Sequence, residues 1–176
     1  LDFGGQAIGG AVNALDKRIP RQLPDRVTGT LIGGYGSAAR ERSVGGAVDF
    51  PLADRLVGHV DASWRKSGDL RVGGKVLSAP LRAELGDEEL ADLSGRIPNS
   101  GVRSTTLGAG VAFIDIGGNL GVSVQRFDTR YGVPLRPGAA EEGDVAIDLV
   151  QTRVDLRGAL ELGGVFDNLQ LRGAYG

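Results

Sequence analysis

Few residues in this chain could do chemistry on their own. The chain has no cysteine and only one histidine, His59, with Asp61 two residues further on. In an extended strand these two side chains lie on the same face. A zinc site needs three or four ligands from histidine, cysteine or carboxylate side chains. We therefore predict that His59 makes hydrogen bonds, and that the chain holds no metal and no cofactor.

Motifs for covalent or nucleotide chemistry are also missing. The pair Gly9-Gly10 lacks the glycine spacing and the following helix of a nucleotide-binding loop. No Gly-x-Ser-x-Gly nucleophile motif occurs. The net charge is −2 with acidic and basic residues interspersed, which argues against nucleic-acid binding. We expect neither an enzyme nor a nucleic-acid-binding protein.

The charged residues indicate surfaces rather than catalysis. One acidic run consists of Glu84, Asp87, Glu88, Glu89 and Asp92. Such a run is typical of a solvated surface, with attraction of a cationic ligand as the alternative. Three arginines, Arg65, Arg153 and Arg157, fall on the polar side of their segments. They either pair with carboxylates such as Asp61 and Asp155 or guide an anionic chelate.

Strands must position these residues. From Leu56 to Arg65, apolar or small residues alternate with polar ones, and the stretch from Val150 to Glu161 repeats the pattern. A period of two over about ten residues is typical of a strand with one apolar and one polar face, as in membrane β-barrels, where about 9–11 residues cross the bilayer. We predict seven strands, at residues 26–36, 42–50, 55–67, 104–115, 119–129, 146–161 and 167–176.

The predicted connections differ in length. Tight turns are expected at residues 51–54, 116–119 and 163–166, and a short one near 37–40. Residues 68–103 and 130–145 are longer connections, the first with a brief helix at 81–93. Short turns at one end and long loops at the other are typical of outer-membrane barrels. Most aromatic residues lie near strand ends, which is typical of the aromatic girdles of membrane barrels. The alternative is that these side chains fill the ends of the hydrophobic core of a soluble sheet.

The composition agrees with a bent sheet. Glycine supplies 30 of 176 residues, which suits strands that bend or admit another backbone. No apolar run approaches 18 residues, so no transmembrane helix is predicted. The chain has no methionine, so we expect Leu1 to follow processing or to lie inside a longer protein. Pro20 and Pro24 indicate a linker, and we divide the chain into residues 1–24 and 25–176.

Residues 3–13 resemble the end of the plug domain in TonB-dependent outer-membrane receptors. In that family an aromatic-Gly pair, a small residue and a Gly-Gly-x-x-Asn motif close the plug just before the barrel; the corresponding residues here are Phe3, Gly9, Gly10 and Asn13. Residues 14–20 resemble the hinge between plug and barrel. Residues 131–134, 141–149 and 153–158 are similar to a branch that includes zinc-scavenging receptors. The loop at 135–142 has none of that branch's histidines, so zinc itself is not predicted.

The resemblance implies an all-β fold, an antiparallel transmembrane β-barrel portion that follows the tail of a plug domain. The chain would supply about seven of about 22 strands, and open edges in lipid are unfavourable, so we expect no stable insertion of this segment alone. The implied function is active uptake of a scarce ligand, a metal chelate, across the outer membrane of a Gram-negative bacterium. A plug rearrangement coupled to the inner-membrane energy complex, through a segment outside this chain, would drive uptake.

The implied partners are outer-membrane lipid, the energy-coupling complex and a small chelate. Candidate ligand-binding residues are Arg65, Arg130 and Tyr131, and the ligand's identity is not predicted. Two alternatives remain, a soluble all-β binding or adhesion module and a passive outer-membrane pore. The plug-like residues 1–24 favour a receptor over a pore.

Overall fold

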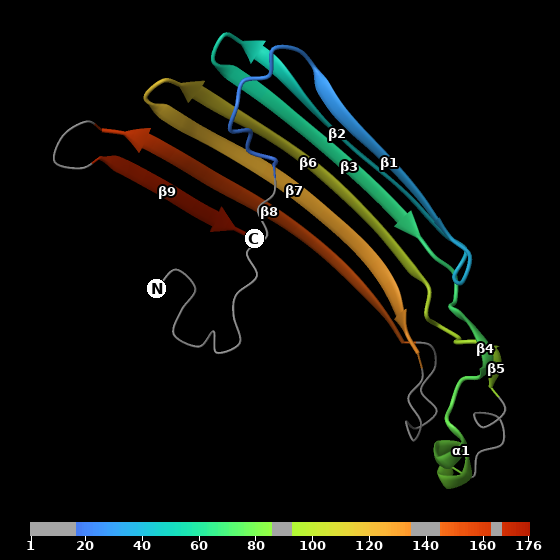
Figure 1. The fold of residues 1–176 in the computed structure, drawn as a ribbon. Coiled ribbons are helices and arrows are strands. Elements are labelled where there is room, and N and C mark those ends of the chain that lie inside the picture. Colours follow the sequence, from blue (N-terminus) through green and yellow to red (C-terminus); the bar gives the residue numbers. More distant parts are fainter. Residues whose placement is uncertain (1–16, 86–92, 135–144, 163–166) are drawn as a thin grey trace.

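The computed structural model describes residues 17–85, 93–134, 145–162 and 167–176. Seven strands form one antiparallel sheet (Figure 1) in the order β1-β2-β3-β6-β7-β8-β9. Their bounds are β1 Thr28–Gly36, β2 Glu41–Ala53, β3 Leu56–Lys66, β6 Val102–Asp115, β7 Gly118–Val133, β8 Val145–Glu161 and β9 Asn168–Tyr175. All seven predicted strands are confirmed, because alternation over about ten residues is a strong strand signal.

The long connection between β3 and β6 contains three short elements. β4 (Arg71–Lys75) and β5 (Ser94–Arg96) form a separate two-stranded sheet, and α1 (Ala79–Leu85) lies between them. The helix begins before the predicted residue 81, with Pro80 in its first turn, where a missing N–H costs nothing. Residues 86–92, which carry most of the acidic run, lie outside the described part.

The turn predicted at residues 51–54 is displaced. β2 continues to Ala53 and the turn falls at Asp54 and Arg55, because a register irregularity between Pro51 and Ala53 accommodates the proline inside the strand. The turn near residue 116 and the one at residues 37–40 are as predicted. The predicted turn at 163–166 lies outside the described residues.

The two ends of the sheet differ. The β2–β3, β6–β7 and β8–β9 connections lie at one end, here called the turn end. The β1–β2, β3–β6 and β7–β8 connections lie at the other, here called the loop end, where the element with α1 also lies (Figure 1). The predicted difference between short and long connections therefore holds, with the short β1–β2 turn as the exception.

The sheet has one apolar and one polar face. Residues paired across antiparallel strands lie on the same face. One cross-strand row is Val48, Val60, Ala109, Val124, Val154 and Tyr175. The adjacent row on the opposite face is Ala47, Asp61, Gly108, Gln125 and Arg153. We call the first the apolar face and the second the polar face.

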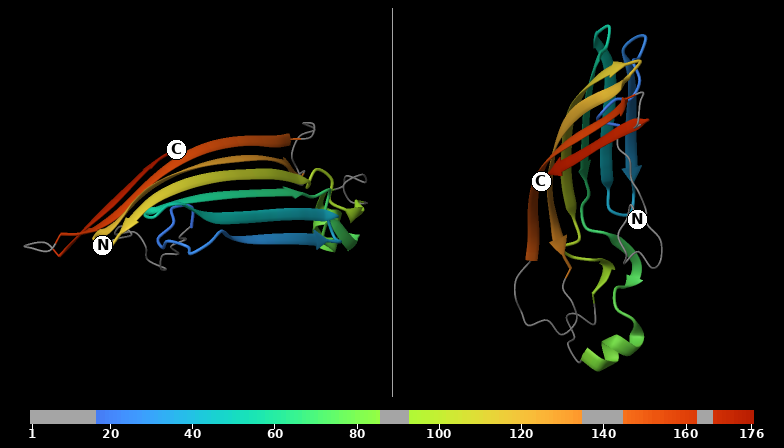
Figure 2. Two further views of the ribbon diagram at one scale, coloured as in Figure 1. Left: turned by 90° about the horizontal axis from the view of Figure 1, so that it is seen from above. Right: turned by 90° about the vertical axis from the view of Figure 1, so that its left-hand side faces the viewer.

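The apolar face is exposed over most of its length. Its exposed side chains include Leu31, Val60, Leu107, Phe113, Leu120, Val122, Val124, Leu156 and Leu171. Only Ile19, Val57 and Ala112 are buried hydrophobic residues among those described. The sheet is a curved, unclosed surface (Figure 2), with β1 and β9 as its edges. A single layer with an uncovered apolar face is not a complete hydrophobic core.

None of the described helices has the length and apolar character needed to cross a membrane.

Candidate functional site

The segment before β1 lies on the polar face. We call residues 17–24 the strap. Arg18 donates to both carboxylate oxygens of Asp61 on β3, at 2.7 Å from Nε and 2.8 Å from Nη2, and to Gln125 Oε1 on β7 at 3.0 Å. The next residue, Ile19, is 4% exposed. A bidentate, partly buried arginine–carboxylate pair fixes both position and orientation, so the strap is anchored over β3, β6 and β7.

Glycines on β6 and β7 make room for the strap. A Cβ atom at Gly110 would collide with the Arg18 carbonyl, and one at Gly121 would collide with the Ile19 side chain. At Gly108 it would meet the ion pair itself. Because glycine has no Cβ, the backbone of the strap can approach the sheet closely here. These three glycines form the seat of the strap.

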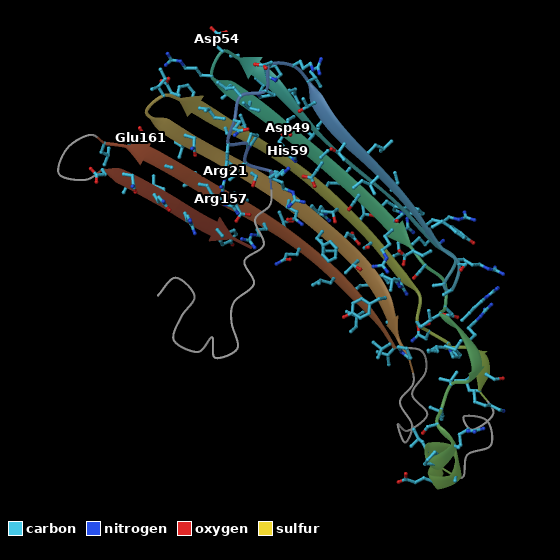
Figure 3. All side chains as sticks on the ribbon, viewed as in Figure 1. Arg21, Asp49, Asp54, His59, Arg157 and Glu161 are labelled. Atoms are coloured by element: carbon cyan, nitrogen blue, oxygen red, sulfur yellow. The ribbon has the colours of Figure 1, made fainter. Side chains whose placement is uncertain are left out.

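His59 extends the network toward the turn end. Its Nδ1 lies 2.7 Å from Asp49 Oδ1 on β2, and its Nε2 lies 3.5 Å from Asp61 Oδ2. The His59 side chain is buried, and Figure 3 shows it beside Asp49 on the same face of the sheet. This agrees with the predicted hydrogen-bonding role. Within the described residues, no cluster of three or more histidine, aspartate and glutamate side chains could hold a metal ion.

Two of the three predicted arginines also meet carboxylates, whereas Arg157 has no carboxylate partner among the described residues, and its Nη1 is buried without a hydrogen-bond partner there. Arg65 Nη2 lies 2.6 Å from Glu41 Oε2, and Arg153 Nη2 lies 2.8 Å from Asp155 Oδ1. Asp155, on β8, is buried. The expected pairing of polar-face arginines is confirmed for both, whereas Asp61 pairs with Arg18 from the strap instead.

The three candidate ligand-binding residues do not come together on one face. Arg65 lies on the polar face at the loop end of β3, and Tyr131 lies on the same face at the loop end of β7. Arg130 lies on the opposite face, where its Nε is 3.7 Å from Asp148. Adjacent residues of a strand point to opposite faces, so only Arg65 and Tyr131 can share a ligand on the polar face.

The polarity of the two faces reverses at the loop end of β7 and β8. There the polar face carries apolar side chains, namely Phe127, Tyr131, Val133, Val145, Ile147 and Leu149. The other face carries Arg126, Asp128, Arg130 and Asp148 at the same level. Phe127 and Tyr131 therefore lie on the polar face, whereas the strand-end aromatics Tyr35, Phe50, Trp64 and Phe113 lie on the apolar face. The patch around Tyr131 is therefore an apolar surface on the polar side.

Several contacts could not be predicted from the sequence pattern. Asp49 was missed, although counting back from the β2–β3 turn brings it near His59. The partnership of Arg18 with Asp61 spans 43 residues and carries no local signal. The predicted plug motif, Gly9, Gly10 and Asn13, lies outside the described residues.

The polar face holds a segment of its own chain, and an apolar patch lies on the same face around Tyr131. No protein-family model matches the chain.

Proposed function

We propose that this chain is part of a TonB-dependent outer-membrane receptor that takes up a small chelate. In this proposal the apolar face contacts lipid and the polar face lines the lumen. The strap is the hinge between plug and barrel. Further strands pair with the free edges of β1 and β9 and close the barrel, since unpaired edges are unfavourable in lipid.

The observation that carries the proposal is the division of the two faces. Val60 and Val124 are 44% and 46% exposed on the apolar face, whereas Asp61 and Gln125, their neighbours in sequence, hold the strap on the polar face. A soluble sandwich would cover its apolar face with a second sheet. A large exposed apolar surface instead favours contact with a membrane.

Strand length supports the same orientation. β7 has 16 residues and β8 has 17, whereas about 9–11 tilted residues cross a bilayer. The residues beyond this length lie at the loop end, where the apolar face becomes charged and the polar face becomes apolar. In the proposal this part projects beyond the bilayer, and the apolar patch around Tyr131 faces incoming ligand.

The strap gives the proposal its mechanism. Arg18 is bound to Asp61 and Gln125 through three hydrogen bonds, so the barrel wall holds one end of the plug in place. A plug that moves when the energy complex acts on it needs such a fixed point. The cargo, a metal chelate, comes from the resemblance in residues 3–13, and Arg65 and Tyr131 are its proposed contacts.

An uptake assay tests the function. Cells with and without the full-length protein would be given a panel of radiolabelled iron, cobalt and zinc chelates, with the inner-membrane energy complex present or deleted. We expect at least one chelate to accumulate only when both are present. A Tyr131→Ser variant should reduce that uptake, with Tyr35→Ser, on the opposite face, as the matched control.

The same assay separates the alternatives. A passive pore would accumulate solute equally without the energy complex. A soluble binding or adhesion module would be recovered folded from the aqueous fraction, with no effect on uptake. Either result would exclude the receptor.

A further inference from the structure

The β7–β8 pair extends past its neighbour β6 at the loop end. β6 begins at Val102, which pairs with Tyr131, so Tyr131 is the last residue of β7 that has β6 beside it. Beyond it, Gly132 and Val133 pair in the sheet only with β8. Two strands without a third are only marginally stable in water. The wall that carries Tyr131 and Ile147 therefore needs support from outside the seven-stranded sheet.

Asn99, in the β3–β6 connection, provides this support. Its Nδ2 donates to two main-chain carbonyl oxygens, at 3.0 Å to Val133 O and at 2.7 Å to Val145 O. Val133 and Val145 form the last pair of β7 and β8 at the loop end, so one amide group joins the ends of both strands. A further hydrogen bond, from Gly132 N to Gly101 O at 3.1 Å, continues the support along β7.

The local backbone suits an asparagine at this position. The φ angle of Asn99 is 53°, in the left-handed region that asparagine adopts more readily than most residues. A Cβ atom at Gly132 would collide with Asn99, so the glycine lets the amide approach β7 closely. An amide nitrogen carries two N–H donors, and the two carbonyl groups use both of them.

Asn99 is itself held in place by the residue that follows it. Leu70 N donates to Ser100 Oγ at 2.8 Å, and Ser100 N donates to Asp69 Oδ1 at 3.1 Å. Residues 68–71 in turn donate two main-chain hydrogen bonds to the β1–β2 turn. The three connections at the loop end thus share one hydrogen-bond network, and this network fixes Asn99 against β7 and β8.

We infer that Asn99 is a positioning residue for the proposed ligand surface. It joins the loop ends of β7 and β8, and so it holds Tyr131 and its cross-strand neighbour Ile147 in the arrangement that a ligand contacts. These two side chains are 36% and 40% exposed on the polar face. The β3–β6 connection thereby sets the affinity for ligand through the β7–β8 wall. The inference rests on the proposed function and adds a residue that acts on the ligand surface from another connection.

Fluorine NMR tests the positioning without any ligand. The full-length protein would be labelled with 3-fluorotyrosine, and the resonances of Tyr131 and Tyr35 would be assigned by their loss in Tyr→Phe variants. Asn99→Asp keeps the size of the side chain and tolerates the left-handed backbone, but it has no N–H donor. We expect it to shift or broaden the Tyr131 resonance and to leave that of Tyr35, at the loop end of β1, unchanged. Asn168→Asp makes the same change at an exposed position at the turn end, and as the matched control it should leave both resonances unchanged.

The uptake assay tests the link to the ligand. The radiolabelled iron, cobalt and zinc chelates would be supplied over a range of concentrations to cells with equal amounts of each variant in the outer membrane. Asn99→Gly is added, because it keeps the backbone conformation and removes the amide without adding a charge. If the wall keeps its arrangement about a tenth of the time, the half-saturating concentration of a transported chelate rises about tenfold. We expect this rise in both Asn99 variants, with an unchanged maximal rate because saturating ligand restores the arrangement, and no rise in Asn168→Asp.

Four results would overturn the inference. An unchanged Tyr131 resonance in Asn99→Asp would show that the amide does not position this wall. A lower maximal rate at the same half-saturating concentration would show a structural role only. An effect in Asn99→Asp without one in Asn99→Gly would show repulsion by the new carboxylate. Uptake of none of the chelates by the unmodified protein would refute the proposed function itself, and the ligand role of Asn99 with it, whatever the Tyr131 resonance shows.

Discussion

A single methyl group at Gly110 should release the strap. The Cβ of alanine at this position would collide with the Arg18 carbonyl group, which is backbone and cannot rotate away. The strap would have to lift by more than an ångström. It would then lose the burial of Ile19 and the three hydrogen bonds of Arg18.

The magnitude follows from these contacts. Burial of an isoleucine stabilises by about 1.5–3 kcal/mol, and hydrogen bonds to charged groups by about 1.5–3 kcal/mol each. Fixing each strap residue costs about 1–2 kcal/mol of backbone entropy, so the net stabilisation is smaller than the sum. A net loss of about 3 kcal/mol corresponds to a change of about 100-fold in the population of the released strap.

Tryptic cleavage of the bond between Arg18 and Ile19 measures this population. A docked strap cannot enter a protease, and cleavage follows the released fraction when release and docking are fast. We expect Gly110→Ala to accelerate cleavage at this bond about 100-fold, as measured by mass spectrometry of the full-length protein. Gly33→Ala is the control, because a Cβ atom at residue 33 would come no closer than 3.9 Å to Ser43 O, which is an ordinary contact. Cleavage at the same rate in both variants would refute the claim that Gly110 allows the strap to dock on the sheet.

Three further substitutions test individual contacts. Asp61→Asn should lower the free energy of unfolding by about 1.5–3 kcal/mol in a urea titration. A double-mutant cycle with Arg18→Gln should show a coupling energy of about 0.5–3 kcal/mol. Additive effects of the two substitutions would exclude the Arg18–Asp61 ion pair. His59→Gln should cost less, about 0.5–1.5 kcal/mol, since Asp49 is 38% exposed and water can replace the bond; a loss as large as that of Asp61→Asn would contradict this ranking. Gly58→Ala should lower the melting temperature, because its Cβ would lie 2.5 Å from the Phe50 ring, and Phe50→Leu should suppress the effect if that overlap is the cause.

The strands were predictable because their signal is local. Alternation from Leu56 to Arg65 fixes both the strand and its faces, and the turn near residue 116 fixes how β6 and β7 pair. The sequence therefore predicts seven strands and the side on which His59 and Asp61 lie. Near Pro51 the pattern misplaces the turn, since a proline inside an irregular strand pair resembles a proline in a turn.

The strap could not be predicted, because its contacts join residues far apart in the chain. Arg18 meets Asp61 and Gln125 only after β3, β6 and β7 have assembled. The role of Gly110 is equally hidden, since a glycine that admits another backbone is spaced like one that only bends a strand. The reversal of polarity beyond Phe127 could not be predicted either, because it depends on how far β7 extends beyond the part of the sheet whose exposed face is apolar.

The central claim is that the apolar face meets lipid and the polar face does not. The accessibility of residues along β7 to oxygen and to a nickel chelate tests this claim most directly. The chain has no cysteine, so spin labels can be placed singly at residue 120 and at residues 122–125 of the full-length protein in lipid vesicles, leaving Gly121 unlabelled because a side chain there would collide with the strap. Labels at Leu120, Val122 and Val124 should collide with oxygen, which concentrates in lipid, and hardly with a water-soluble nickel chelate. Labels at Ser123 and Gln125 should show low oxygen accessibility. A nickel-accessible Val124, or no alternation between neighbouring residues, would contradict the account.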